Sequence, residues 1–165
     1  QGSPQAAFVE NNAKETLVME TWVKSPKAQT LGAWVDCAGL YGAYSRLQVP
    51  HTMRRGEWNH CGASVSVNGV ALPPPEWKQP GMKSTTKAIR EQDIPYSTDL
   101  LEKPLVDELV TLRAPTPVAL KAGWNHIRIV LPPRKLRRGA TFCFIDGTSE
   151  HPREVEGLEY SSEPR

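Results

Sequence analysis

Apolar and polar residues alternate in several short segments of this chain, and this alternation constrains its fold more than any other feature. In the segment "ETLVMETWVKSP" the odd-numbered positions are mainly apolar, namely Leu17, Met19, Thr21 and Val23. The even-numbered positions are Val18, Glu20, Trp22 and Lys24. A period of two places successive side chains on opposite faces of a β-strand. The pattern therefore predicts a strand over 17–24 with one face toward a core.

The same period recurs further along the chain. It predicts strands at 31–37, 118–120, 124–131 and 141–145, and we expect the first of these to pair with 17–24. Asn68-Gly69 predicts a tight hairpin turn, because both residues tolerate a positive φ. Before the strand at 124–131, Gly123 is expected to supply a turn whose backbone is hydrogen-bonded by Asn125.

These short strands predict the fold class. No amphipathic window of helical length occurs, and 15 prolines separate the apolar segments. The prediction is an all-β fold: an antiparallel β-sandwich of jelly-roll, galactose-binding-like type with long loops. A chain of 165 residues fits one domain, which we place at 4–150. Residues 1–3 resemble a tag remnant, and 151–165 form a polar C-terminal tail.

Charge and apolar content exclude several classes of function. Twenty basic and 18 acidic residues give a net charge of +2, and the basic segment 134–139 contains no aromatic residue that could stack a base, so no nucleic-acid partner is expected. No apolar run approaches the roughly 20 residues that span a bilayer, so no membrane insertion is expected. The three cysteines, Cys37, Cys61 and Cys143, lack the spacing of metal ligands. The sequence is compatible either with one disulfide and one free thiol or with three free thiols.

Two long loops contain side chains suited to binding sugar. A pyranose presents an apolar C–H face to a flat aromatic ring, and planar polar side chains bind its hydroxyls. The candidates in the loops are Tyr44, Arg46, Trp58, His60, Glu76 and Trp77. Prolines 73–75 stiffen the chain before Glu76-Trp77 and hold it in one pose. The alternative is that Trp58 and Trp77 plug the ends of the sandwich.

One family resemblance adds to this interpretation. The run "GEWNHCGASVSVNGVALPPPEWKQPG", continued by "PLVDELVTLRAPTPVALKAGWNHIRIVLPP" and "TFCFID", resembles the C-terminal accessory region of large bacterial family 20 glycoside hydrolases. These are β-N-acetylhexosaminidases of the Bacteroides and Akkermansia type, and the resemblance covers Gly56 to Asp146. It implies a module appended to a separate (β/α)₈ barrel that uses an adjacent Asp-Glu pair. This chain has an adjacent pair, Asp107-Glu108, but it is far shorter than the ~250 residues of such a barrel. We therefore do not expect this pair to be a catalytic dyad.

The predicted function is therefore that of a non-catalytic carbohydrate-binding module. No nucleophile elbow, phosphate loop or H-E-x-x-H motif is present in the sequence, and we expect no enzyme activity. The resemblance implies a secreted, periplasmic or outer-membrane-associated parent hydrolase acting on host or mucin glycans, with glycan and the catalytic domain as partners. The alternative is a structural spacer that packs against that domain and binds no sugar. No cofactor is expected, although Asp36, Asp107 and Asp146 could hold a structural calcium.

Overall fold

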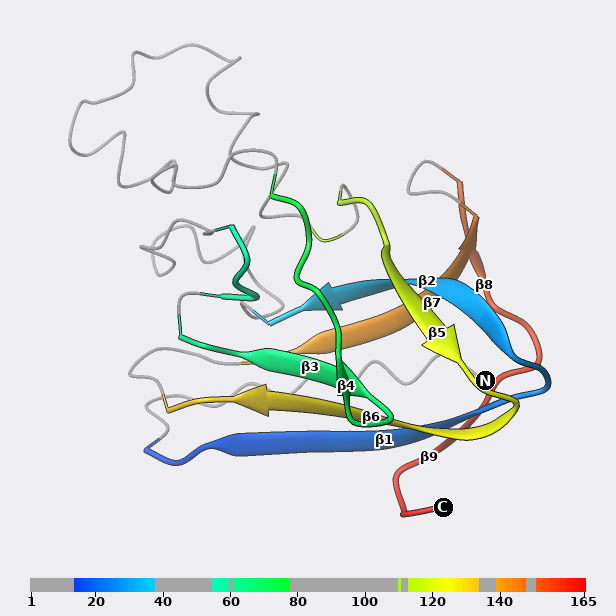
Figure 1. Ribbon diagram of the computed structural model, residues 1–165, viewed down its shortest axis with the longest axis horizontal. Helices are drawn as coiled ribbons and strands as arrows, with labels where there is room; N and C mark the ends of the chain where they lie inside the picture. The colour runs from blue at the N-terminus through cyan, green and yellow to red at the C-terminus, as the bar shows by residue number, and fades with distance from the viewer. Residues whose placement is uncertain are drawn as a thin grey trace, which may run out of the picture.

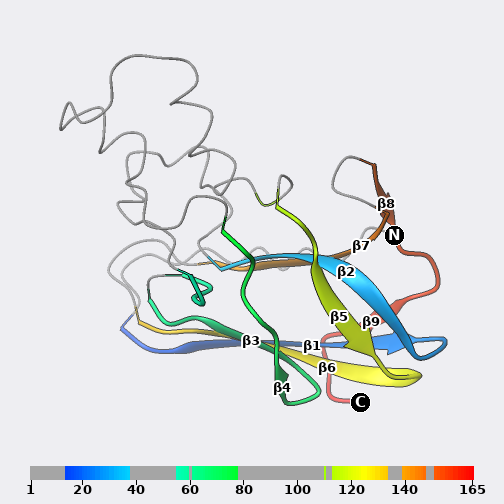
Figure 2. The ribbon, with the colours of Figure 1, turned by 45° about the horizontal axis from the view of Figure 1, so that its top comes forward.

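The fold consists of two antiparallel β-sheets packed face to face. A computed structural model describes residues 14–37, 55–59, 61–77, 110, 113–133, 139–147 and 151–165. The strands in these residues are β1 (Leu17–Ser25), β2 (Gln29–Asp36), β3 (Ser64–Val67), β4 (Val70–Ala71), β5 (Thr116–Leu120), β6 (Gly123–Leu131), β7 (Thr141–Gly147), β8 (Pro152–Glu154) and β9 (Glu159–Ser161). The orders β4-β3-β6-β1-β9 and β5-β2-β7-β8 form the two layers (Figures 1 and 2). The predicted all-β sandwich is confirmed.

Consecutive strands tend to lie in opposite sheets, as in a jelly roll. The expected pairing of 17–24 with 31–37 is wrong, because β1 pairs with β6 and β9, whereas β2 pairs with β5 and β7. The three residues 26–28 carry the chain from one sheet to the other. Alternation fixes which face of a strand is buried, but it does not determine which strand lies beside it.

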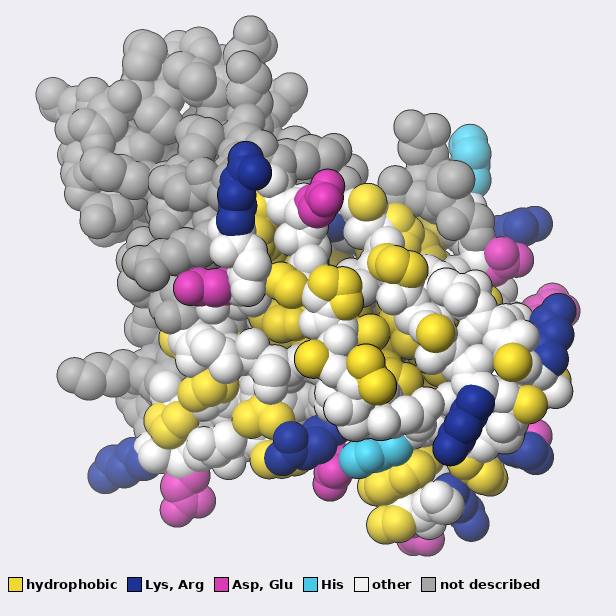
Figure 3. Space-filling model, viewed as in Figure 1, with side chains coloured by type: hydrophobic (Ala, Val, Ile, Leu, Met, Phe, Trp, Pro, Cys, Tyr) yellow, Lys and Arg dark blue, Asp and Glu magenta, His cyan; other side chains and the backbone are white. Residues whose placement is uncertain are grey.

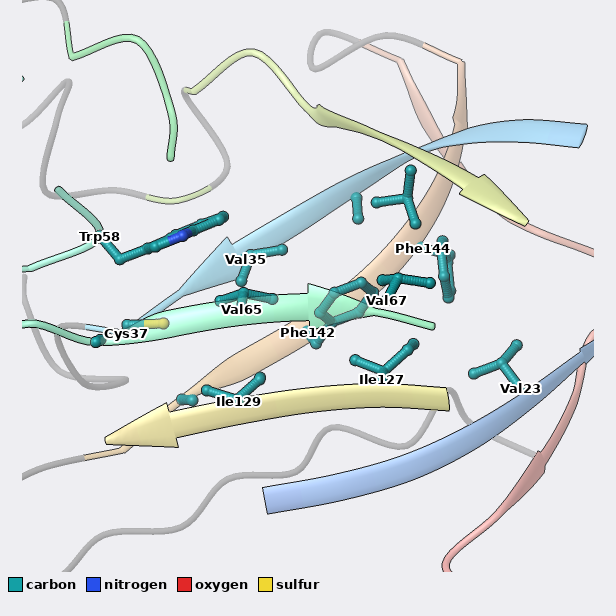
Figure 4. Close-up of a cluster of buried hydrophobic side chains, with 14 of the residues drawn as sticks. Val23, Val35, Cys37, Trp58, Val65, Val67, Ile127, Ile129, Phe142 and Phe144 are labelled. Atoms are coloured by element: carbon teal, nitrogen blue, oxygen red, sulfur yellow. The ribbon is translucent and has the colours of Figure 1, made fainter. Parts of the chain in front are cut away.

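The inward faces of both sheets form one hydrophobic core. Its largest fully buried apolar side chains include Val23 of β1, Val65 of β3, Val118 of β5 and Ile127 of β6. Figure 4 shows these sheets contributing side chains that point toward one another. Full burial of one such side chain stabilises the fold by about 1.5–3 kcal/mol. The odd-numbered residues of β1 and β6 face this core, and their even-numbered residues face outward.

The predicted hairpin turn joins β3 to β4. Asn68 has a φ of 53° and Gly69 a φ of 79°, the two positive values that a type I′ turn requires. Gly123, with a φ of 86°, lies at the predicted second turn between β5 and β6. Both turn predictions are confirmed.

Asn125 joins these two turns from a fully buried position. Its Oδ1 accepts hydrogen bonds from the Lys121 backbone N–H at 2.9 Å and from Asn68 Nδ2 at 2.8 Å. Its Nδ2 donates to the carbonyl oxygens of Lys121 and Gly123 at 2.9 Å, and to that of Val23 at 3.3 Å. The amide thus satisfies backbone groups that the turn would otherwise leave unpaired, as the sequence predicted.

The C-terminal residues extend the sandwich beyond the boundary that the sequence suggested at 150. In the structure, β8 pairs with β7, and β9 pairs with β1, so 151–165 contributes a strand to each sheet. Each of these strands is three residues long, Pro-Arg-Glu in β8 and Glu-Tyr-Ser in β9. Three residues are too few to show a hydrophobic period, so these strands could not be predicted from the sequence.

Candidate functional site

Trp77, the leading loop candidate for sugar binding, is buried. Its side chain is 6% exposed, and its Nε1–H donates to the Glu57 carbonyl oxygen at 3.0 Å. The Arg113 guanidinium lies over the ring, 4.7 Å from its centroid, and Arg113 Nη1 is 3.3 Å from Asp36 Oδ1. Arg113 and Asp36 are also buried. Trp77 therefore covers a buried ion pair at one end of the sandwich.

Trp58, the second aromatic candidate, is also 6% exposed. Its Nε1–H donates to the Leu72 carbonyl oxygen at 3.3 Å, and Figure 4 shows its indole at the end of the core near Val35 and Cys37. The adjacent Asn59 donates to the Cys37 carbonyl oxygen at 2.8 Å. These contacts attach the segment 55–59 to its neighbours and favour the interpretation that both tryptophans act as plugs.

The structure does not gather the other predicted loop residues into a described site. Glu76 is exposed beside the buried Trp77, so the two adjacent side chains do not share one surface. The remaining candidates lie outside the described residues: Tyr44, Arg46 and His60.

The carboxylates proposed for calcium do not form a site in the described residues. Asp36 pairs with Arg113, and on the surface Asp146 lies 3.2 Å from Arg153 Nη2. Asp107 lies outside the described residues. Among the part of the chain that the structure describes, no cluster of three metal-ligating side chains occurs. The three cysteines are free thiols, and burial raises the pKa of Cys37 far above its usual range.

A different surface brings aromatic and polar side chains together. The outward side chains in the middle of β1 and β6 define what we call the aromatic face: Glu20, Trp22, Lys24, Trp124, His126 and Arg128. Antiparallel register places them in three cross-strand pairs, Glu20 opposite Arg128, Trp22 opposite His126 and Lys24 opposite Trp124. Figure 3 shows basic, acidic and histidine side chains along the lower margin, where Figure 1 has these two strands.

The centre of the aromatic face is a stacked pair. The Trp22 and His126 ring centroids are 4.9 Å apart with an interplanar angle of 13°. His126 Nε2 lies 2.9 Å from Glu20 Oε1, and Arg128 Nε lies 3.8 Å from the same oxygen. Within the described residues, His126 Nε2 has no hydrogen-bond partner of acceptable geometry. These contacts hold the two rings in a fixed orientation on a rigid sheet.

The second aromatic side chain, Trp124, is half-buried and flanked by cations. Lys24 Nζ lies 5.9 Å from its ring centroid, and the guanidinium carbon of Arg165 lies 5.5 Å from it. Lys24 also forms an ion pair with Glu159 Oε1 at 2.9 Å. Trp124 therefore presents a partly exposed indole beside donors and acceptors.

The sequence contains one signal for this face. Large aromatic side chains at Trp22 and Trp124 fall on the polar sides of strongly alternating segments, where burial does not require them. The two residues are about one hundred positions apart in the chain, and they become neighbours because β1 pairs with β6. Without that pairing, neither residue alone suggests a site.

A small, partly open cavity offers no better place for a sugar. A cavity of about 60 Å³ lies between the sheets and is lined mainly by apolar side chains, including Val23, Ile127, Phe142, Phe144 and Tyr160. Such a lining supplies few partners for sugar hydroxyls.

In the described residues no helix is long and apolar enough to cross a membrane.

Comparison with known proteins found no match, so a function can be inferred only from the site. No family, curated protein or solved structure matches this chain.

Proposed function

We propose that this chain is a non-catalytic carbohydrate-binding module that binds sugar on the aromatic face. The observation that carries the proposal is the stacked Trp22–His126 pair next to Trp124 on the outer surface of a rigid sheet. Aromatic rings at such a position can contact the C–H face of a pyranose, and the adjacent Glu20 and Arg128 can bind its hydroxyls. The proposal moves the predicted site from the loops to the sheet.

The strand location suits weak but specific binding. Side chains on paired strands are already ordered before a ligand arrives, so binding loses little conformational entropy. When a module is tethered to an enzyme, even weak affinity raises the local concentration of substrate. The resemblance to hexosaminidase accessory regions supports such a tether in a secreted bacterial hydrolase acting on host or mucin glycans.

The test compares binding by the intact chain and three variants. Oligosaccharides of N-acetylglucosamine and galactose are titrated into wild type, Trp22→Ala, Trp124→Ala and the control Val70→Ala, whose side chain is 69% exposed away from the face. Each tryptophan variant should weaken binding about tenfold or more, which corresponds to about 1.4 kcal/mol, while Val70→Ala binds as wild type does. Absence of binding by the wild type, or equal binding by all four proteins, would refute the proposal.

A structural spacer is the second candidate, and the burial of Trp58 and Trp77 favours it. In that case the aromatic face packs against a catalytic domain and binds no sugar. The spacer predicts that Trp22→Ala lowers the Tm of the chain joined to its catalytic domain more than the Tm of the isolated chain. A carbohydrate-binding module predicts the same small change in both.

A further inference from the structure

The charges of the aromatic face point to the kind of glycan it takes. We infer that the face binds a neutral oligosaccharide of at least two sugar units and discriminates against polyanionic glycans, an inference that rests on the proposed function. Discrimination requires that the cations of the face be neutralised by neighbours. Binding of at least two sugar units requires two aromatic contacts at the spacing of adjacent sugars.

Lys24 and Arg128, the described basic side chains in the strands of the face, each have a carboxylate nearby, and so does the His126 imidazole. Lys24 Nζ is 2.9 Å from Glu159 Oε1, and His126 Nε2 is 2.9 Å from Glu20 Oε1. Arg128 Nε is 3.8 Å from the same Glu20 oxygen. A sulfated or carboxylated glycan would meet these carboxylates as well as the cations, and like charges in close contact cost free energy. The hydroxyls of a neutral sugar can instead accept from the cations and donate to the carboxylates.

The two indoles are spaced for more than one sugar. Trp22 lies opposite His126, and Trp124 lies opposite Lys24, so the tryptophans are diagonal neighbours on the same face. Diagonal neighbours on paired strands are about 7–8 Å apart, and their Cβ atoms are somewhat closer. A single pyranose cannot stack on both rings at once, whereas two linked units running diagonally across β1 and β6 can. Binding should therefore strengthen from monosaccharide to disaccharide.

Glu20 is the residue on which this selectivity depends. Its carboxylate lies beside both His126 and Arg128, and a Glu20→Gln substitution replaces it by an uncharged amide of the same shape. The variant leaves those two side chains without their anionic neighbour. It should gain affinity for anionic glycans, and that gain should fall steeply as salt is added, because exposed charges are screened.

The experiment titrates the intact wild-type chain and Glu20→Gln with two ligand series at low and high salt. The neutral series is N-acetylglucosamine and its disaccharide and trisaccharide, and the charged series is sulfated heparin oligosaccharides of the same lengths. Glu154→Gln is the matched charge control, because it also replaces one carboxylate by an amide and Glu154 lies on β8 in the other sheet. It should leave the ranking of the ligands unchanged.

The inference predicts that wild type binds the neutral disaccharide at least about fivefold more tightly than the monosaccharide, with little salt dependence. It also predicts that Glu20→Gln binds heparin fragments about tenfold more tightly than wild type does. Wild-type preference for heparin fragments would overturn the inference while leaving the proposed function intact. Binding of the monosaccharide as tightly as the disaccharide would also overturn it, and failure to bind either series would refute the proposed function itself.

Discussion

The Arg113 guanidinium lies between the indole of Trp77, 4.7 Å from the ring centroid, and the carboxylate of Asp36, 3.3 Å from Nη1. Trp77→Ala removes the ring that covers this buried pair and leaves the Glu57 carbonyl oxygen without its donor. The variant should lower the free energy of unfolding by about 3–5 kcal/mol, the usual cost of truncating a buried tryptophan. Urea denaturation of the isolated chain measures this change.

Glu76→Ala is the matched control for this prediction, because Glu76 is exposed next to the buried ring. It should change stability by less than about 0.5 kcal/mol. A Trp77→Ala variant that remains as stable as wild type but no longer binds sugar would show that Trp77 does not act as a plug. It would support the sugar-binding site predicted in the loops.

The sequence around Trp77 predicts the conformation of the backbone there but not the direction in which the indole points. Prolines 73–75 predict an extended, stiff approach to the tryptophan. Whether the indole faces water depends on Arg113 and Asp36, which come from distant parts of the chain. Contacts of that kind leave no local pattern, so the burial of Trp77 required the structure.

Asn125 should be among the most sensitive polar positions in the chain. Asn125→Ala leaves the Lys121 N–H and the Val23 and Gly123 carbonyl oxygens without the side chain that binds them. Each unsatisfied buried group costs about 1–3 kcal/mol, although water can enter and reduce the total. We expect a loss of at least about 2 kcal/mol in the free energy of unfolding, measured by chemical denaturation.

Asn125→Asp separates the roles of the two amide atoms. Aspartate keeps acceptor oxygens for the Lys121 N–H and Asn68 Nδ2, but it cannot donate to the carbonyl oxygens when ionised. It also places a charge at a fully buried position, so it should destabilise the fold at pH 7 at least as much as alanine does. Wild-type stability of either variant would show that the hydrogen bonds of Asn125 are dispensable.

The fold class and two turns could be predicted because their signals are local. Alternation identified the buried side of β1, and Asn68-Gly69 and Gly123 identified turns whose φ values are positive. The partners of each strand could not be predicted, because any apolar face can cover the same core. The aromatic face depends on one of those pairings, so the sequence contained its residues but not their proximity.

Alkaline pH should destabilise the chain through Tyr160. Burial first, then the neighbouring Cys143 and Glu154, raises the pKa of Tyr160 to about 12. An unfolded tyrosine has a pKa of about 10, so between about pH 10 and 12 the unfolded chain binds fewer protons than the folded chain. Stability should therefore fall as pH rises through this interval. Urea midpoints measured from pH 8 to 11.5 record the loss.

Tyr160→Phe keeps the ring and removes the ionising group, so its stability should fall less steeply above pH 10. Some loss should remain, because burial also raises the pKa of the Cys37 thiol and favours its neutral form in the folded chain. If the difference in tyrosinate absorbance between the two proteins titrates near pH 10, Tyr160 ionises as a solvated phenol and the prediction is wrong.

Removing the Arg165 side chain should strengthen sugar binding. Ser161 Oγ accepts from Arg165 Nε at 3.1 Å, and the guanidinium lies over Trp124, 5.5 Å from its centroid. A sugar that stacks on Trp124 from this side must displace Arg165, and an exposed cation–π contact is worth about 0.5–1 kcal/mol. Arg165→Ala should therefore lower the Kd for a neutral disaccharide about two- to fivefold. Arg153→Ala makes the same change in charge on the other sheet and should leave the Kd unchanged, whereas weaker binding by Arg165→Ala would show that Arg165 itself contacts the ligand.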